Sequence, residues 1–187
     1  MKRNFFRKLV AAIGGLTMAA MLPVSSMASA AADPTLRFAA DKSTVRAGDT
    51  VILSVMADNL PANGWNLLEF AIGYNENQLE PVMVWDDEIE EEFEWTPGPA
   101  LNLKTSLTDV NFGVNPILGA TISTAGQKRN GEILNIRFKV KDTVKRGNQI
   151  VLNTTLKQFA QSIIVDGTSH IVELVQPETS TVNLTVV

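Results

Sequence analysis

Apolar and polar residues alternate along several stretches of the chain. In residues 50–59, four apolar side chains fall on one face of an extended chain: Val51, Leu53, Val55 and Ala57. The same period of two recurs in residues 66–74, 132–140, 150–154 and 182–186. This alternation is typical of strands that bury one face, and no stretch has a convincing helical period.

Turn-forming residues separate these stretches. The turn signals are Gly48-Asp49, Asn63-Gly64, Asn75-Glu76-Asn77, Asn130-Gly131, Gly147-Asn148 and Asp166-Gly167. Short alternating stretches punctuated in this way are typical of all-β sandwiches. We therefore predict a jelly-roll β-sandwich of about eight to nine strands.

The N-terminus has the pattern of an export signal. A basic start (residues 1–8) precedes an apolar run (residues 9–22), and Ala28-Ser29-Ala30 supplies the small residues that signal peptidase accepts. The run is shorter than the roughly 20 residues that span a bilayer. We predict a signal peptide over residues 1–30, cleaved near Ala30, and a single domain over residues 31–187. The mature protein is then expected to be secreted, or held at the cell surface, without a membrane span.

Composition excludes several kinds of function. The 187 residues include no Cys and one His, which excludes disulfides, thiolate metal sites, cysteine nucleophiles and multi-histidine metal sites. The first 30 residues carry four basic side chains and no acid. The rest has 12 basic against 20 acidic residues, a net charge of −8. This charge argues against nucleic acid as a partner. No G-x-S-x-G motif or pocket-forming carboxylate pair supports catalysis, so we expect a protein that is not an enzyme.

One acidic stretch interrupts the alternation. Residues 85–95 read WDDEIEEEFEW, with seven acids between two tryptophans. Ile89 and Phe93 are four residues apart, which suits a short helical turn, and a surface loop is the alternative. Candidate calcium ligands are Asp86, Asp87 and Glu88. Their spacing lacks the D-x-D-x-D-G pattern of a calcium loop, which favours a solvated acidic surface over a metal site.

Aromatic residues raise the question of carbohydrate binding. The candidates for stacking on a sugar ring are Trp65, Trp85 and Trp95. They lie near expected strand ends and in the acidic stretch instead of in one row along a strand, which favours core packing or loop anchoring.

Three stretches together resemble one known family. Residues 45–51 (VRAGDTV) are similar to a Gly-Asp turn that leads into a strand. Residues 70–80 (FAIGYNENQLE) are similar to a strand that ends at a Tyr turn, and residues 131–141 (GEILNIRFKVK) to a later strand of the same family. The family is that of cohesin domains, and the resemblance runs from about residue 35 to residue 187. The sequence departs from its pattern at Asn75 and Glu76, where the family usually has Asp and Pro.

The resemblance implies a non-catalytic protein-binding module. Cohesins are secreted β-sandwiches that hold dockerin-bearing enzymes on cellulosome scaffolds, so it implies a dockerin-type partner and a role in extracellular polysaccharide degradation. It implies docking on one sheet face, partly through the strand before Tyr74. By alternation, the outward residues of that strand are Leu67, Glu69, Ala71 and Gly73. No cofactor is implied, and any calcium would belong to the partner. Two alternatives stay open: a carbohydrate-binding module of the same fold that takes polysaccharide, and a structural envelope protein without a ligand.

Overall fold

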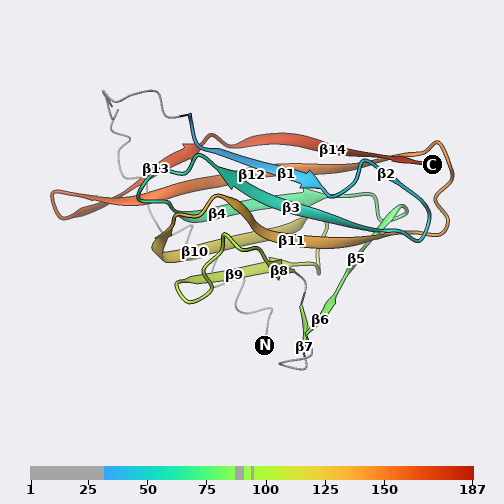
Figure 1. Ribbon diagram of the computed structural model, residues 1–187, viewed down its shortest axis with the longest axis horizontal. Coiled ribbons are helices and arrows are strands. Elements are labelled where there is room, and N and C mark those ends of the chain that lie inside the picture. The colour runs from blue at the N-terminus through green and yellow to red at the C-terminus, as the bar shows by residue number, and fades with distance from the viewer. Residues whose placement is uncertain (1–31, 87–90, 94) are drawn as a thin grey trace.

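The computed structural model describes residues 32–86, 91–93 and 95–187, and these residues form strands and turns without a helix (Figure 1). The strands of sheet A are β1 (Thr35–Ala40), β3 (Thr50–Asp58), β5 (Leu79–Val82), β8 (Thr96–Pro97) and β11 (Gly131–Val140). Their order is β1-β3-β11-β5, with β8 also beside β11.

Sheet B packs against sheet A. Its strands are β2 (Thr44–Val45), β4 (Trp65–Gly73), β9 (Ser106–Asn111), β10 (Ile117–Gln127), β12 (Gln149–Val165), β13 (Thr168–Val175) and β14 (Glu178–Val186). The order is β2-β14-β12-β4-β10-β9, with β13 also beside β12. The predicted all-β sandwich is thus confirmed. The described residues hold more strands than the expected eight to nine because short strands such as β2 and β8 add to the long ones.

The core lies between the inner faces of the two sheets. The alternation that predicted β3 is confirmed: its four apolar residues from Val51 to Ala57 are fully buried. From sheet B, Phe70 packs edge-on against Phe38 of β1, with ring centroids 5.8 Å apart. Burying one large apolar side chain contributes about 1.5–3 kcal/mol to folding. This core therefore has to stabilise the fold in a chain without disulfides.

The three stretches that carry the family resemblance meet at one end of the sandwich. The Gly48 amide donates to the Val140 carbonyl at 2.9 Å, and the Lys141 amide donates to the Gln78 carbonyl at 2.9 Å. Gly48 has a φ of +83°, a left-handed conformation that favours glycine. These motif residues therefore hold strand ends together, which is a structural role.

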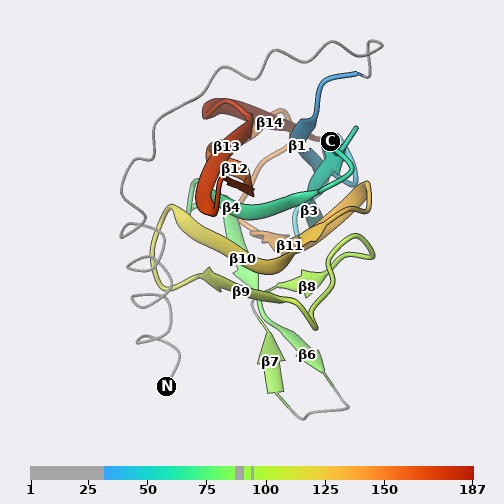
Figure 2. The same ribbon diagram turned by 90° about the vertical axis from the view of Figure 1, so that its left-hand side faces the viewer.

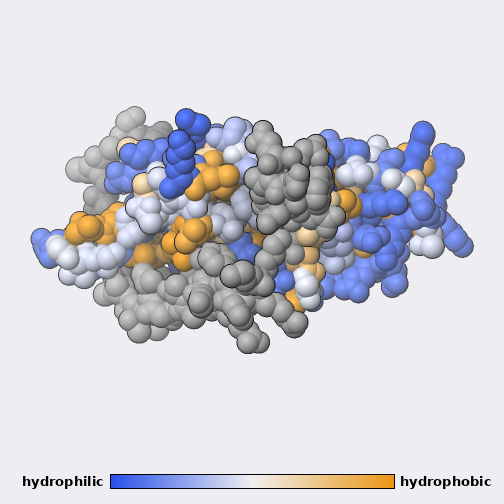
Figure 3. All heavy atoms as spheres, turned by 90° about the horizontal axis from the view of Figure 1, so that it is seen from below, coloured by the Kyte–Doolittle hydropathy of each residue, from blue (hydrophilic) through white to orange (hydrophobic). Residues whose placement is uncertain are grey.

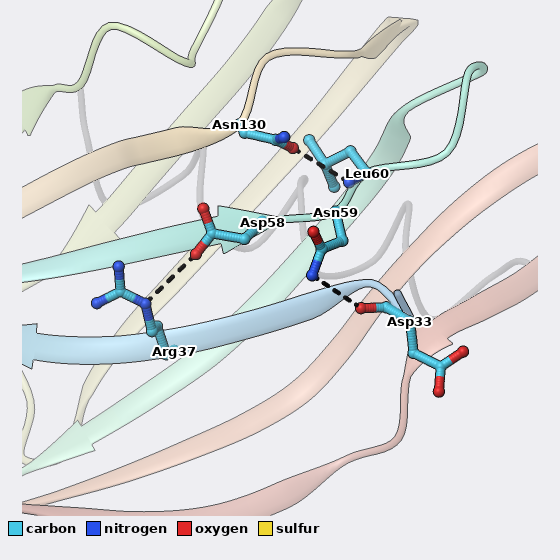
Figure 4. Close-up of polar contacts among 6 residues, drawn as sticks. All are labelled: Asp33, Arg37, Asp58, Asn59, Leu60 and Asn130. Atoms are coloured by element: carbon cyan, nitrogen blue, oxygen red, sulfur yellow. Dashed lines mark hydrogen bonds and ion pairs between the residues drawn. The ribbon is translucent and has the colours of Figure 1, made fainter. Parts of the chain in front are cut away.

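Polar contacts fasten the start of the domain to neighbouring segments (Figure 4). They are Asn59 Nδ2 to the Asp33 carbonyl at 3.4 Å, Arg37 Nε to Asp58 Oδ2 at 3.4 Å, and the Leu60 amide to Asn130 Oδ1 at 3.1 Å. The chain is therefore tied to the sandwich just before β1 begins. The predicted signal peptide, residues 1–30, lies outside the described residues.

The acidic stretch contains a separate two-stranded hairpin. Strands β6 (Val84–Asp86) and β7 (Glu91–Phe93) pair antiparallel and project away from the two sheets (Figures 1 and 2). The expectation of a helical turn or a loop is therefore wrong at Phe93, which lies in a strand opposite Val84. Of the candidate calcium ligands, Asp86 lies in β6, while Asp87 and Glu88 lie outside the described residues.

Candidate functional site

Strand β4 runs through the middle of sheet B and has one face toward the core. Leu68, Phe70 and Ile72 are fully buried in that core. Because side chains alternate along a strand, the intervening residues lie on the outer face of the sheet. These are the four predicted docking residues, Leu67, Glu69, Ala71 and Gly73. The structure thus places these four residues on the outer face of the sheet. Their role in binding stays a prediction.

Residues from three neighbouring strands complete this outer face. The strand registers define three rows across the sheet. An apolar row contains Leu107, Ile122, Leu67 and Ala160. A charged row contains Asp109, Ala120, Glu69 and Gln158. A third row contains Asn111, Leu118, Ala71 and Thr155. Along β4 the apolar row lies toward the Trp65 end of the strand, the charged row comes next, and the third row follows it.

The apolar side chains differ in their exposure. Leu67 and Ala71, in the central strand, are only 8% and 7% exposed, although they belong to the outer face. Leu107 in the edge strand β9 is 59% exposed. Leu67 lies between Ile122 and Ala160 in the strand registers, so neighbouring strands flank the centre of the face. Accessible apolar surface is thus greater at the edge than at the central strand.

One ion pair crosses the charged row. Lys157 Nζ lies 3.3 Å from Glu69 Oε1, and both side chains retain solvent contact. The register of β12 shifts between Leu156 and Gln158, and this irregularity brings Lys157 and Gln158 together beside Glu69. An exposed pair of this kind contributes at most about 1 kcal/mol to stability. Either side chain can therefore exchange this partner for a group of another molecule at little cost in stability.

The combined geometry resembles a protein-binding surface. Protein interfaces combine apolar side chains with polar groups, and this face has an apolar row beside a charged row. Among the residues described, no group of three or more His, Asp or Glu is arranged to hold a metal ion. Within the same residues, no helix is long and apolar enough to cross a membrane.

The family model for the cohesin domain matches residues 36–174. The chain belongs to the cohesin family. This match covers both sheets, including β4, β9, β10 and β12. Cohesin domains are non-catalytic binding modules, which agrees with the expectation drawn from the three sequence stretches. No curated protein matches the chain.

Solved cohesins share the fold at low sequence identity. The seventh ScaB type I cohesin of Pseudobacteroides cellulosolvens is 18% identical with a TM-score of 0.57, and the match covers 81% of this chain and 92% of that one. CaCohA2 of Clostridium acetobutylicum is 14% identical with a TM-score of 0.56, covering 82% and 92%. The Coh-OlpA-Doc918 complex of Clostridium thermocellum, a type I cohesin–dockerin complex, gives 15% identity and a TM-score of 0.54, covering 82% and 99%.

Two of the three tryptophans have side chains that the structure describes, and neither is exposed for sugar stacking. Trp65 is fully buried, with its ring 5.5 Å from that of Phe159, which agrees with core packing and excludes it as a stacking residue. Trp95 is half-buried and packs against the core. Trp85 lies in β6. Among residues whose side chains the structure describes, the exposed large hydrophobics include no aromatic residue.

Tyr74 follows β4 and is part of the core boundary of this cohesin. Its ring packs against that of Phe138, with the ring centroids 5.5 Å apart. Burial, and then the nearby charge of Glu76, raise the pKa of Tyr74 above its usual value of 10.0. The residue therefore acts as a packing group at the end of β4.

Sequence reasoning found only one strand of this face. The outer residues of β10 were missed because its inner face includes Gly119 and Thr121, which hide the alternation. Thr121 is fully buried, and its hydroxyl lies 2.9 Å from that of Thr108. The available signal was the short connection between the strand of Leu107 and the strand of Leu118, which makes the two strands neighbours in the sheet.

Proposed function

We propose that this cohesin docks a dockerin-type protein module on the outer face of β4, β9, β10 and β12. The observation that carries the proposal is the apolar row, Leu107, Ile122, Leu67 and Ala160, beside the ion pair of Glu69 and Lys157. An apolar row supplies affinity through burial, while the charged groups beside it favour one partner orientation.

Family membership and solved relatives support a dockerin-type partner. The Coh-OlpA and Coh-OlpC structures of Clostridium thermocellum are both type I cohesin–dockerin complexes. On this proposal the protein anchors dockerin-bearing enzymes in extracellular polysaccharide degradation. The calcium ions of such a complex would be held by the partner, so chelation would release it.

Export is part of the same proposal. We expect the signal peptide to be removed after Ala30, which leaves a mature protein that begins at Ala31. The test is the intact mass of the protein recovered from cells that express the full-length chain. A retained N-terminal segment in the recovered protein would contradict the proposed cleavage.

The docking test uses the protein purified from expression of the full-length chain. Each dockerin module encoded by the source organism is purified with calcium and titrated against it by calorimetry. Leu67→Arg, which adds a charge to the apolar row, and Glu69→Arg, which reverses the charge beside Lys157, should each weaken binding by at least ten-fold. Leu107→Arg replaces a second apolar residue of the row. This position is exposed, so folding does not require an apolar side chain there.

The matched control lies on the opposite sheet. Met56→Arg puts the same charge on the outer side of β3, where the side chain is half-buried, and should leave dockerin binding unchanged. Thermal unfolding of every variant separates loss of binding from loss of folding. The proposal fails if no dockerin binds the unaltered protein, or if the outer-face variants bind as well as Met56→Arg.

A further inference from the structure

A two-stranded arm extends from the docking face. Strand β12 is 17 residues long, and its final part pairs with β13 beyond the rest of sheet B (Figure 1). Figure 2 looks toward the tip of this arm. Residue alternation continues from Ala160 through Ser162 to Ile164, so all three lie on the side of β12 that carries the apolar row. The docking face and the arm thus share one strand.

The arm has a defined turn at its tip. Asp166 and Gly167 form a two-residue connection with φ values of +51° and +78°. Asp-Gly with both φ values positive is the preferred sequence for this hairpin turn. The hydroxyls of Ser162 and Ser169 lie 2.9 Å apart across the two strands. A partner would therefore meet an ordered hairpin and lose little entropy in fixing it.

The tip exposes apolar side chains. Ile164 is 77% exposed, and Val165 beside it is also exposed. Opposite Ile164 stands Ser169, which is too small to cover it. In Figure 3, hydrophobic residues among those described gather toward the arm end, while the opposite end is mainly hydrophilic. One exposed Ile alone would be ordinary, but this Ile continues an apolar face on a rigid support.

The charges at the base of the arm favour a different molecule, and not a second copy of this chain, as the occupant of this surface. Glu69 is paired by Lys157, whereas Glu173 accepts a hydrogen bond from the neutral amide of Gln158 at 3.0 Å. Its other oxygen, Oε2, is buried and has no hydrogen-bond partner among the described residues. Two copies joined at this surface would bring like charges together, while a basic partner would be complementary.

We propose that the arm is a second contact region for the dockerin-type partner, in which Ile164 packs against an apolar side chain and Glu173 lies near a basic group. This inference rests on the proposed docking function. Ile164 lies about 13 Å beyond Ala160, at roughly 3.3 Å per residue. The partner must therefore be long enough to reach from the apolar row to the tip, and the arm selects among dockerins by that reach.

The test compares two exposed apolar residues at opposite ends of the molecule. Ile164→Ser and Val187→Ser are made in the protein from the full-length chain and titrated with the purified, calcium-loaded dockerin modules of the source organism. Val187 is 48% exposed at the C-terminus and serves as the control. We expect Ile164→Ser to weaken binding of the cognate dockerin about ten-fold or more, and Val187→Ser to leave it unchanged. Glu173→Gln should weaken it less and reduce its salt dependence.

The outcomes separate this inference from the docking proposal. If Leu107→Arg abolishes binding while Ile164→Ser does not affect it, the face docks the partner and the inference about the arm is wrong. If no dockerin binds, both proposals fail. If Ile164→Ser converts a dimer to a monomer in light scattering and leaves dockerin binding unchanged, a second copy occupies the arm and the inference is also overturned.

Discussion

The outer faces of the two sheets differ in how their polar groups are satisfied. On sheet A, Glu132 accepts hydrogen bonds from Ser54 at 2.5 Å and from Asn135 at 3.0 Å, and Thr96 of β8 donates to Asn135. On sheet B, the apolar row crosses four strands beside one half-exposed ion pair. The polar groups around Glu132 on sheet A are thus bonded to one another, whereas the outer face of sheet B keeps an exposed apolar side chain, Leu107, at its edge.

This difference agrees with the proposed use of the outer face of sheet B for docking. A self-satisfied polar network gains little from a partner because docking would strip water from groups already bonded. Burying apolar surface against a partner is favourable in free energy and needs no matched hydrogen-bond donors and acceptors. The following changes test the comparison, beginning with the largest expected effect.

Phe70→Ala tests which side of β4 faces inward. Phe70 is fully buried, so the substitution should lower the free energy of unfolding by about 3–5 kcal/mol, measured by urea denaturation. Glu69→Ala, one residue away on the outer face, should change it by less than about 1 kcal/mol. Equal losses would mean that the inner and outer faces of sheet B are wrongly assigned.

Gly119→Ala tests how tightly the inner side of sheet B is packed. A Cβ at Gly119 would lie 2.1 Å from Cζ of Phe70, so we expect a loss of about 1–3 kcal/mol in thermal or urea unfolding. Gly73→Ala is the matched control on the outer face, where the nearest atom to a new Cβ is 3.7 Å away. The Phe70→Leu background should reduce the cost of Gly119→Ala. If Gly119→Ala costs as much stability in the Phe70→Leu background as it does alone, the proposed clash is ruled out.

Glu132→Ala and Lys157→Ala compare the two polar arrangements directly. Removing Glu132 leaves its donors Ser54 and Asn135 without that partner and should cost about 1–3 kcal/mol. Removing Lys157 breaks only a half-exposed ion pair and should cost less than about 1 kcal/mol, falling further in 1 M salt. A larger, salt-independent loss for Lys157→Ala would show that the charged row stabilises the fold.

Tyr74 gives the smallest effect, confined to alkaline pH. Its pKa is raised by burial and by Glu76, so the unfolded chain loses the phenolic proton at lower pH than the folded protein does. The resulting stability is complete below the unfolded pKa near 10 and is lost as pH rises through the folded pKa. Unfolding measured from pH 9 upward should show this loss, and Tyr74→Phe should reduce it. An ultraviolet titration with an unraised pKa would contradict the packing of Tyr74.

The sequence predicted strands best where one face is wholly apolar. Residues 50–59 and 132–140 correspond closely to β3 and β11, because each alternates large apolar residues with polar ones. Asn63-Gly64 was predicted as a turn, and Gly64 has a φ of +68°. A Cβ there would lie 2.2 Å from the Gln127 carbonyl oxygen, so this turn also requires a close backbone approach.

The parts that were missed lack a regular period. Alternation was detected only from Ile150 to Thr154 in β12, because the shift between Leu156 and Gln158 moves later residues out of phase. The arm beyond that shift was therefore unforeseen. For Trp65 the sequence favoured core packing or loop anchoring over sugar stacking, but it did not predict the contact with Phe159. Registers between distant strands determine both features, and a single sequence does not specify them.

The parallel pairing of β2 with β14 has a consequence for the order of folding. Thr44 lies opposite Thr185, and Val45 lies opposite Val186. This contact joins the first part of the domain to its last residues, and loop closure over such a distance costs entropy before any contact compensates for it. Sheets built from distant strands fold slowly, typically in milliseconds to seconds. Sheet B therefore cannot be completed until β14 is available to pair with β2, so the domain stays partly unfolded until its last strand has been synthesised.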